Sequence, residues 1–295
     1  FPLSVDDVEG ILKQGGTILN TSRTNPFKSN EQLNSCLNTI KENNFDAIVA
    51  IGGDDTLGAA TRLHEEHGIN TVGVPKTIDN DLSGTDYTFG FDTAVSIATD
   101  AIDRCRTTAA SHHRTLVVEV MGRHAGWIAL HSGVASGADV ILIPEFPFSM
   151  KDVNERLKKS YDSGHKNHIV VVAEGAQMED QDEFVTKNES VDEFGHVLLG
   201  GIGDQLADQI EESIGLETRS VILGHIQRGG TPTARDRMLA TRYGLKAADM
   251  LAEGKFGQMA ALQGDDIVTV PLTTATGELK VVSKELYEMT KYLTV

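Results

Sequence analysis

The chain has 295 residues, of which 40% are hydrophobic and 23% are charged, which is typical of a globular protein long enough for one large α/β domain or two smaller ones. Its net charge of −17 argues against nucleic acid or an anionic membrane as a partner, because such surfaces are bound mainly by clustered cations. We find no apolar run near the ~20 residues of a membrane span and no signal peptide. Two distant cysteines, Cys36 and Cys105, favour a reduced, cytoplasmic protein.

Short runs rich in Val and Ile alternate with helical patterns along the chain. We predict strands at 46–53, 70–75, 115–122, 139–145, 168–175 and 219–225, and helices at 55–67, 92–109, 203–214 and 233–252. Continuous apolar strands between helices are typical of a parallel sheet covered on both faces, so the sequence predicts an α/β fold. The acidic segment 178–196 has no clear period, and we expect an exposed, irregular excursion there.

Unusual polar clusters follow five of the predicted strands. They read "GGDD", "PKTIDND", "MGRHAG", "AEG" and "GHIQRGG". Parallel sheets place ligands in the crevice beyond the carboxyl ends of their strands. Five clusters at such ends therefore indicate one shared site.

The cluster "GGDDT" combines flexibility with negative charge. Gly52 and Gly53 let a ligand approach the backbone, and the following helix offers unpaired amides to a phosphate. Asp54 could hold a magnesium ion, because this hard cation prefers oxygen ligands. The alternative is that Asp54 or Asp55 merely caps the helix.

The cluster "PKTIDND" follows the next predicted strand. A strand–helix–strand unit brings its strands side by side, so both acidic clusters should face one crevice. In an extended segment Asp79 and Asp81 would point the same way. Two close carboxylates repel each other, which raises the pKa of one of them. A carboxylate with a raised pKa is suited to act as a base that accepts a hydroxyl proton. The alternative is an ordinary Asx-rich turn.

Cations flank two later strands. A strand of about eight residues spans roughly 26 Å, so Arg114 and Arg123 cannot both reach one small ligand within a subunit. Arg114 is then either a surface charge or part of a neighbouring subunit's site. Arg219 precedes the second strand, and His225 and Arg228 follow it. Arginine forks match phosphate geometry, whereas a lone histidine is more often a core residue.

Taken together, "GGDDT", "PKTIDND", "RTLVVEVMGRHAGW" and "LGHIQRGG" resemble the phosphofructokinases, from residue 15 to at least residue 241. The resemblance implies two doubly wound, Rossmann-like domains with mainly parallel sheets and an active site in the cleft between them. We expect 1–89 plus 227–277 to form the larger, donor-phosphate domain and 90–226 plus 278–295 the smaller, sugar-phosphate domain. Family members open with a strand and a glycine-rich loop that do not precede Phe1, so we expect a fragment, a processed form or the ordered part of a longer protein.

The resemblance also implies phosphoryl transfer to the 1-hydroxyl of fructose 6-phosphate, with residues in these roles. Asp79 is the base, Asp81 and Thr77 assist it, Asp54 holds the magnesium, and Arg23 steadies the moving phosphoryl group. The implied sugar-phosphate residues are Met121, Gly122, Arg123, Glu174, His225 and Arg228. Arg114 and Arg219 resemble arginines that a neighbouring subunit lends, so we expect a homo-oligomer, a dimer or a tetramer, with shared active sites.

The donor is predicted from two positions. Members that use ATP usually carry glycine where this chain has Asp55 and Lys76. An aspartate there repels the α-phosphate of a nucleotide, and a lysine neutralises a leaving phosphate. Together with Gly52 and Gly53, the pair resembles the pyrophosphate-dependent branch. The alternative for the pair is that Asp55 is only a cap and Lys76 a solvated side chain. For the function, the alternatives are an ATP-dependent enzyme and a non-catalytic regulatory homologue. The kinases of NAD and lipids share "GGD" but neither "GHIQRGG" nor "MGRHAGW".

Overall fold

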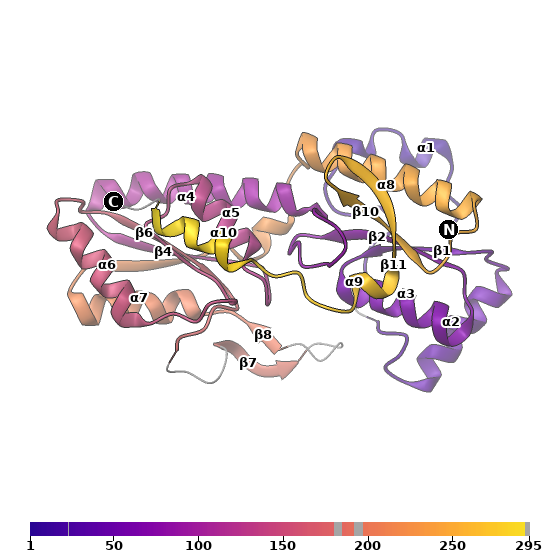
Figure 1. The fold of residues 1–295 in the computed structure, drawn as a ribbon, viewed down its shortest axis with the longest axis horizontal. Coiled ribbons are helices and arrows are strands. Elements are labelled where there is room, and N and C mark those ends of the chain that lie inside the picture. The colour runs from indigo at the N-terminus through magenta and orange to yellow at the C-terminus, as the bar shows by residue number, and fades with distance from the viewer. Residues whose placement is uncertain (23, 180–184, 192–196, 293–295) are drawn as a thin grey trace. The chain divides into compact units, whose positions relative to one another are not determined.

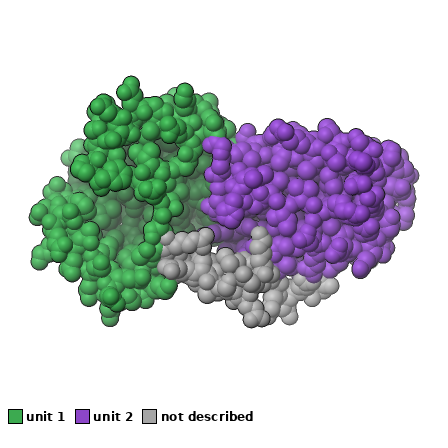
Figure 2. Space-filling model, turned by 180° about the vertical axis from the view of Figure 1, so that it is seen from behind, with its two compact units in different colours: residues 1–92, 191–196, 231–280 green, residues 93–190, 197–230, 281–295 purple. Residues whose placement is uncertain are grey.

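A computed structural model describes residues 1–22, 24–179, 185–191 and 197–292. The chain forms two compact units (Figure 2). Unit 1 comprises Phe1–Asp92, Val191–His196 and Thr231–Lys280, and unit 2 comprises Thr93–Ser190, Val197–Gly230 and Val281–Val295. The predicted domain boundaries, after residues 89, 226 and 277, lie a few residues before the boundaries of the units, after residues 92, 230 and 280. The assignment of the domains to the donor and to the sugar phosphate stays a prediction.

The sheet of unit 1 is built around one central strand. Its order is β1 (Ile48–Gly52), β2 (Thr71–Thr77), β10 (Gln258–Gln263) and β11 (Asp266–Pro271), with β3 (Phe89–Gly90) also paired to β2. β1, β3 and β10 run parallel to β2, whereas β10 and β11 form an antiparallel hairpin. Gly52 lies opposite Pro75, so β1 and β2 end at the same edge.

Helices cover both faces of this sheet (Figure 1). On one face α3 (Asp54–His67) and α9 (Leu272–Ala275) pack on alternate residues of β10, with α2 (Asn30–Glu42) on the same side. On the other face α8 (Ala234–Ala252) buries Tyr243 and Met250 against Val72 and Val74. The short α1 (Val5–Val8) and the 3-10 helix η1 (Ile11–Lys13) precede α2.

The main sheet of unit 2 is entirely parallel. Its order is β5 (Val140–Leu142), β6 (His168–Ala173), β4 (Thr115–Val120) and β9 (Thr218–Ile222). All six residues of β4 and of β6 are buried, because helices lie on both faces. α6 (Met150–Asp162) and α7 (Ile202–Ile214) cover one face, and α4 (Phe91–His112) and α5 (Trp127–Ala135) lie on the other (Figure 1).

Smaller elements complete unit 2. They are the two-stranded sheet of β7 (Thr186–Val191) and β8 (Val197–Leu199), the 3-10 helices η2 (Gly224–Arg228) and η3 (Met289–Tyr292), and α10 (Lys284–Glu288). Cys36 and Cys105 are free thiols. Across the described residues, no helix is long and apolar enough to cross a membrane.

The α/β prediction and the six predicted strands are confirmed, although most predicted strands run past the real ends, whereas β2 continues to Thr77, beyond the predicted 70–75. The strand predicted at 139–145 is Val140–Leu142, because its apolar run continues into a loop. The predicted helices correspond to α3, α4, α7 and α8. The expected irregularity of 178–196 is wrong for 186–191, which form β7. Residues 180–184 and 192–196 lie outside the described part of the chain.

Candidate active site

The "GGDD" cluster joins β1 to α3 in unit 1. Gly52 ends β1, and Gly53 is the N-cap of α3 without a side-chain cap bond. Asp54 and Asp55 lie in the first turn instead, so the alternative that one of them is the cap residue is wrong. The positive end of a helix favours carboxylates there. A Cβ atom at Gly52 would overlap the Thr56 side chain, so this position requires glycine.

The "PKTIDND" cluster lies beside it. Lys76 and Thr77 end β2, which pairs with β1, and a Cβ atom at Gly53 would lie 3.3 Å from Thr77 Cβ. The predicted meeting of these two clusters at one sheet edge is therefore confirmed within unit 1. Thr77 Oγ1 accepts a hydrogen bond from the Asp79 backbone N–H (3.2 Å) and donates one to Asp79 Oδ2 (3.3 Å). Thr77 thereby orients Asp79.

The loop that carries Asp79 and Asp81 is not extended, which corrects the sequence-based argument. Asn80 between them has a φ of +53°, a left-handed conformation that asparagine adopts more readily than most residues. Its Oδ1 accepts the Thr88 backbone N–H at 3.0 Å. The turn alternative therefore describes the backbone correctly. It does not account for burial, since Asp79 and Asp81 are only 6% and 8% exposed and buried carboxylates are costly.

In unit 2 a second cluster lies at the ends of β4 and β6. Glu174 follows β6, and its Oε1 accepts the backbone N–H of Gly122 (3.4 Å) and of Arg123 (3.1 Å), which follow β4. Gly122 and Arg123 both have positive φ, +148° and +52°. A Cβ atom at Gly175 would overlap the Arg123 carbonyl oxygen. The turn after β4 is therefore packed closely against the turn after β6.

The third strand end of unit 2 contributes η2. His225 and Arg228 are exposed there, so the alternative of a core histidine is wrong. Sequence reasoning missed Gln227, which is 1% exposed. Its Oε1 accepts the Met121 backbone N–H (3.3 Å), and its Nε2 donates to the Gly224 carbonyl (3.1 Å). Gln227 ties η2 to the β4 turn, and its place between two candidate residues was the available signal.

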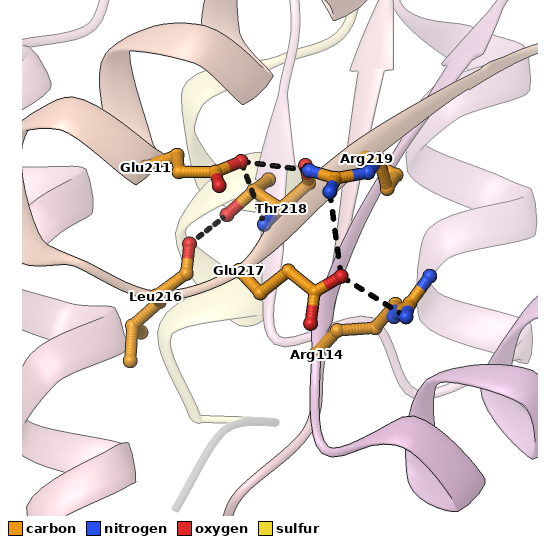
Figure 3. A network of polar contacts seen from close by, with 6 residues as sticks. All are labelled: Arg114, Glu211, Leu216, Glu217, Thr218 and Arg219. Carbon is orange, nitrogen blue, oxygen red and sulfur yellow. Dashed lines mark hydrogen bonds and ion pairs between the residues drawn. The ribbon is translucent and has the colours of Figure 1, made fainter.

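Arg114 and Arg219 lie elsewhere, at the amino ends of neighbouring strands. Arg114 precedes β4, at the opposite end from Arg123, and Arg219 lies inside β9 rather than before it, which corrects the prediction. Glu217 Oε1 accepts from both guanidinium groups, at 3.0 Å from Arg114 Nη2 and 3.4 Å from Arg219 Nη2 (Figure 3). Glu211 Oε2 accepts from Arg219 Nη1 at 2.8 Å. Two glutamates thus hold the two arginines side by side.

Two glutamates with structural roles escaped the sequence analysis, the buried Glu119 and the half-buried Glu145. Glu119, in the middle of β4, is 2% exposed and accepts the backbone N–H groups of Gly201 and Gly203 at the start of α7. Glu145 accepts the N–H groups of Gly126, the N-cap of α5, and of Val282. Each carboxylate satisfies amides that a helix start leaves unpaired. A glutamate inside a Val-rich strand was the signal for the first.

The remaining predictions concern Arg23 and the metal. Arg23 lies outside the described residues. Among the described residues there is no group of three or more His, Cys, Asp or Glu side chains that could hold a metal ion. Magnesium needs no such cage, because it is usually bound by one or two carboxylates, substrate phosphates and water. The oxygen donors of Asp54, at the start of a helix that suits phosphate, fit this chemistry.

Glycine-rich strand ends that lead into helix N-termini on α/β units are typical of proteins that bind phosphorylated small molecules. Comparison with known proteins specifies the class. The chain belongs to the phosphofructokinase family, whose sequence model matches residues 1–251. The recognition made from four short clusters is thereby confirmed.

Individual relatives cover nearly the whole chain. It is 59% identical over 287 residues to a pyrophosphate–fructose 6-phosphate 1-phosphotransferase of Amycolatopsis methanolica. The matched residues cover 97% of this chain and 83% of the relative. It is 49% identical over 280 residues to an ATP-dependent 6-phosphofructokinase of Corynebacterium efficiens (95% and 80%). The crystal structure of Pichia pastoris phosphofructokinase in the T-state matches with a TM-score of 0.80 at 31% identity, over 99% of this chain and 31% of that one.

Proposed function

We propose that this chain transfers a phosphoryl group from pyrophosphate to the 1-hydroxyl of fructose 6-phosphate, giving fructose 1,6-bisphosphate and phosphate. The observation that carries the proposal is the 59% identity to a relative named for this reaction. The presence of Asp55 and Lys76 at the donor positions supports it. Pyrophosphate and fructose 1,6-bisphosphate carry comparable phosphate bonds, so the reaction is reversible. We assign the reaction to glycolysis in the cytoplasm.

Asp79 is the base of the proposed reaction. It takes the proton of the sugar hydroxyl while that oxygen bonds to phosphorus and the bridging P–O bond of pyrophosphate breaks, releasing inorganic phosphate. Thr77, within 3.3 Å, holds the carboxylate in one orientation, and burial to 6% exposure keeps water from competing for it. Asp81 lies two residues further on and assists by its charge.

The substrates need charge compensation, because phosphoryl transfer is catalysed mainly by positioning and neutralisation. Magnesium held by Asp54 would neutralise charge on the donor phosphates. Arg123 and Arg23 serve the transferred group, and Gly52 and Gly53 let the donor approach the backbone. Lys76 meets the leaving phosphate, and Asp55 excludes a nucleotide.

The sugar phosphate is bound in this proposal by the groups of unit 2. The paired N–H groups of Gly122 and Arg123 are already oriented by Glu174, and Met121 by Gln227. His225 and Arg228 take the 6-phosphate. Arg114 and Arg219 lie at the amino ends of β4 and β9, opposite to the strand ends that carry the other groups. In this proposal they therefore act on the site of a neighbouring subunit in a homo-oligomer.

An ATP-dependent enzyme is the second candidate, favoured by relatives of that name at 49% identity. The retention of Asp54, Asp79, Arg123 and Glu174 argues against a non-catalytic homologue. The test measures fructose 1,6-bisphosphate formed from fructose 6-phosphate with pyrophosphate and, separately, with ATP. We expect turnover with pyrophosphate and little with ATP. The reverse result would exclude the proposed donor, and no product with either donor would exclude the activity.

A further inference from the structure

A short segment at the end of unit 1 runs along the acidic loop. Residues 278–280 lie antiparallel to residues 81–83, with a bridge between Leu82 and Leu279. The Lys280 backbone N–H donates to the Asp81 carbonyl at 2.9 Å, and Ser83 Oγ donates to the Glu278 carbonyl at 2.6 Å. The chain thus returns, almost 200 residues later, to the loop that follows β2.

The side chain of Lys280 reaches further along the same loop. Its Nζ donates to the carbonyl of Thr85 (3.0 Å) and to that of Asp86 (2.6 Å). Together with its backbone bond to Asp81, this one residue contacts the loop at three places. The carboxylates of Asp81 and Asp86 also act on the ammonium and favour its charged form.

The loop depends on such contacts for its shape. Residues 78–88 form no helix and no strand, and Asn80 has a positive φ. Besides Lys280, the Asn80 side chain bonds to the Thr88 N–H, and the Tyr243 hydroxyl bonds to Thr85 and Tyr87. Tyr243 and Asn80 are buried, whereas Lys280 is partly buried, at the edge of the loop.

We propose that Lys280 is a positioning residue for phosphoryl transfer: its ammonium holds the loop in the shape that presents Asp79 and Asp81. The inference rests on the proposed function, because it takes Asp79 as the base. Lys280 donates to backbone carbonyl groups of this loop, so it acts on the reaction through the loop. Its loss should therefore lower the rate of transfer more than the affinity for the sugar phosphate.

The pH dependence of the activity tests this role, because a lysine that only stabilises the fold would not change the activity when it loses its proton. Burial lowers the pKa of Lys280 from 10.5 to about 8, against the opposing effect of Asp86 and Asp81. The ammonium therefore becomes neutral at a lower pH in the folded than in the unfolded state. Between about pH 8 and pH 10.5 the unfolded state binds the extra proton, so Lys280 makes the folded state more stable as the pH rises. Activity should fall in that range because the neutral amine donates weaker hydrogen bonds than the ammonium, while the deprotonation of Lys280 does not itself destabilise the fold.

The experiment compares Lys280→Met, Lys280→Arg and the exposed control Lys255→Met in the full chain, using fructose 6-phosphate and pyrophosphate. We expect kcat of K280M to fall by about a hundredfold near neutral pH, since a small misplacement of a catalytic group has that effect, while KM changes less than about threefold and Tm stays within a few degrees. K280R should restore part of kcat and remove the loss of activity above pH 8 seen in the wild type. K255M should match the wild type.

Three results would overturn the inference. The first is a folded K280M with kcat within about twofold of the wild type, which is far from the effect of misplacing a base. The second is a wild-type kcat that stays constant through pH 8 and above, which decides the matter if K280M does not fold. The third is a K280R variant with an unchanged alkaline decline. Wild-type turnover is measured first, because its absence contradicts the proposed function and not the role of Lys280.

Discussion

The Arg123 backbone N–H donates to Glu174 Oε1 over 3.1 Å, and this bond joins the ends of β4 and β6. The same oxygen accepts the Gly122 N–H. One carboxylate therefore fixes a turn in which two consecutive residues have positive φ.

Glu174→Ala should lower kcat/KM for fructose 6-phosphate by about a hundredfold, because hydrogen bonds to a charged group contribute about 1.5–3 kcal/mol and the turn amides lose their acceptor. Glu174→Gln keeps an oxygen acceptor and should lose less. Steady-state kinetics with both variants tests this. Equal losses would mean that the negative charge, and not the orientation of the turn, is what matters.

Asp79→Asn should reduce kcat by a factor of about 10² to 10⁴, the usual contribution of a general base. The amide keeps the shape of the side chain, so Tm should change little. Asp103→Asn, on the exposed surface of α4, is the matched control and should retain full activity. A D79N variant with nearly normal kcat would remove Asp79 from the role of base.

The donor preference can be tested by replacing Asp55 and Lys76 together with glycine. Without the aspartate a nucleotide is no longer repelled, and without the lysine a leaving phosphate is no longer neutralised. We expect turnover with ATP to appear and kcat/KM for pyrophosphate to fall by at least about tenfold. Unchanged use of pyrophosphate in the double variant would contradict the assignment of these two residues.

Sharing of sites between subunits can be tested by mixing two inactive variants. Arg114→Met lacks the arginine lent to a neighbour, and Asp79→Asn lacks the base, so a mixed oligomer holds one site with both groups intact. Co-expression should restore measurable turnover, whereas each variant alone should stay low. No recovery in verified mixed oligomers would place Arg114 outside the neighbour's site. Methionine retains most of the apolar stem of the arginine.

Tyr243 offers a stability test independent of catalysis. Its hydroxyl donates to the Tyr87 carbonyl (2.6 Å) and also contacts Thr85 Oγ1 and the Leu262 N–H. Tyr243→Phe should lower the free energy of unfolding in urea by about 1–3 kcal/mol, because it leaves buried polar groups unsatisfied. Tyr292→Phe, at an 88% exposed position, is the control and should have no effect.

The pH dependence of that difference follows from proton binding. Burial raises the pKa of Tyr243 from 10.0 to about 12, so the folded state holds the phenolic proton more tightly than the unfolded state. The stabilisation is fully present below pH 10 and is lost as the pH rises toward 12. The difference between wild type and Y243F should shrink over that range. A constant difference would contradict the assigned burial of the hydroxyl.

The strands of the main sheets were predictable where their apolar runs are continuous, as in β4 and β6, because both faces of a parallel sheet are buried. The hairpin of β10 and β11 was missed, although Gly264 and Asp265 between two apolar runs are a turn signal. The short α5 was missed because its apolar residues show almost no helical periodicity.

The candidate site was predictable as far as its groups follow strands. Gln227 carries no charge, and its place between His225 and Arg228 was its one local signal, whereas Lys280 lies in a polar tail with no local signal of its role. Their importance arises from contacts between residues far apart in sequence, which a pattern of neighbours does not encode. At Asn80 the extended geometry was the wrong expectation, and the Asx-rich turn given as the alternative was the correct one.

The missing space beside Gly52 and Gly175 limits how this protein can evolve. A Cβ atom at Gly52 would collide with the Thr56 side chain, and one at Gly175 would collide with the Arg123 main chain, which is costly to displace. A single substitution at Gly175 should therefore destabilise the fold. Exposed positions such as His225 and Arg228 can instead accept other side chains without disturbing the scaffold.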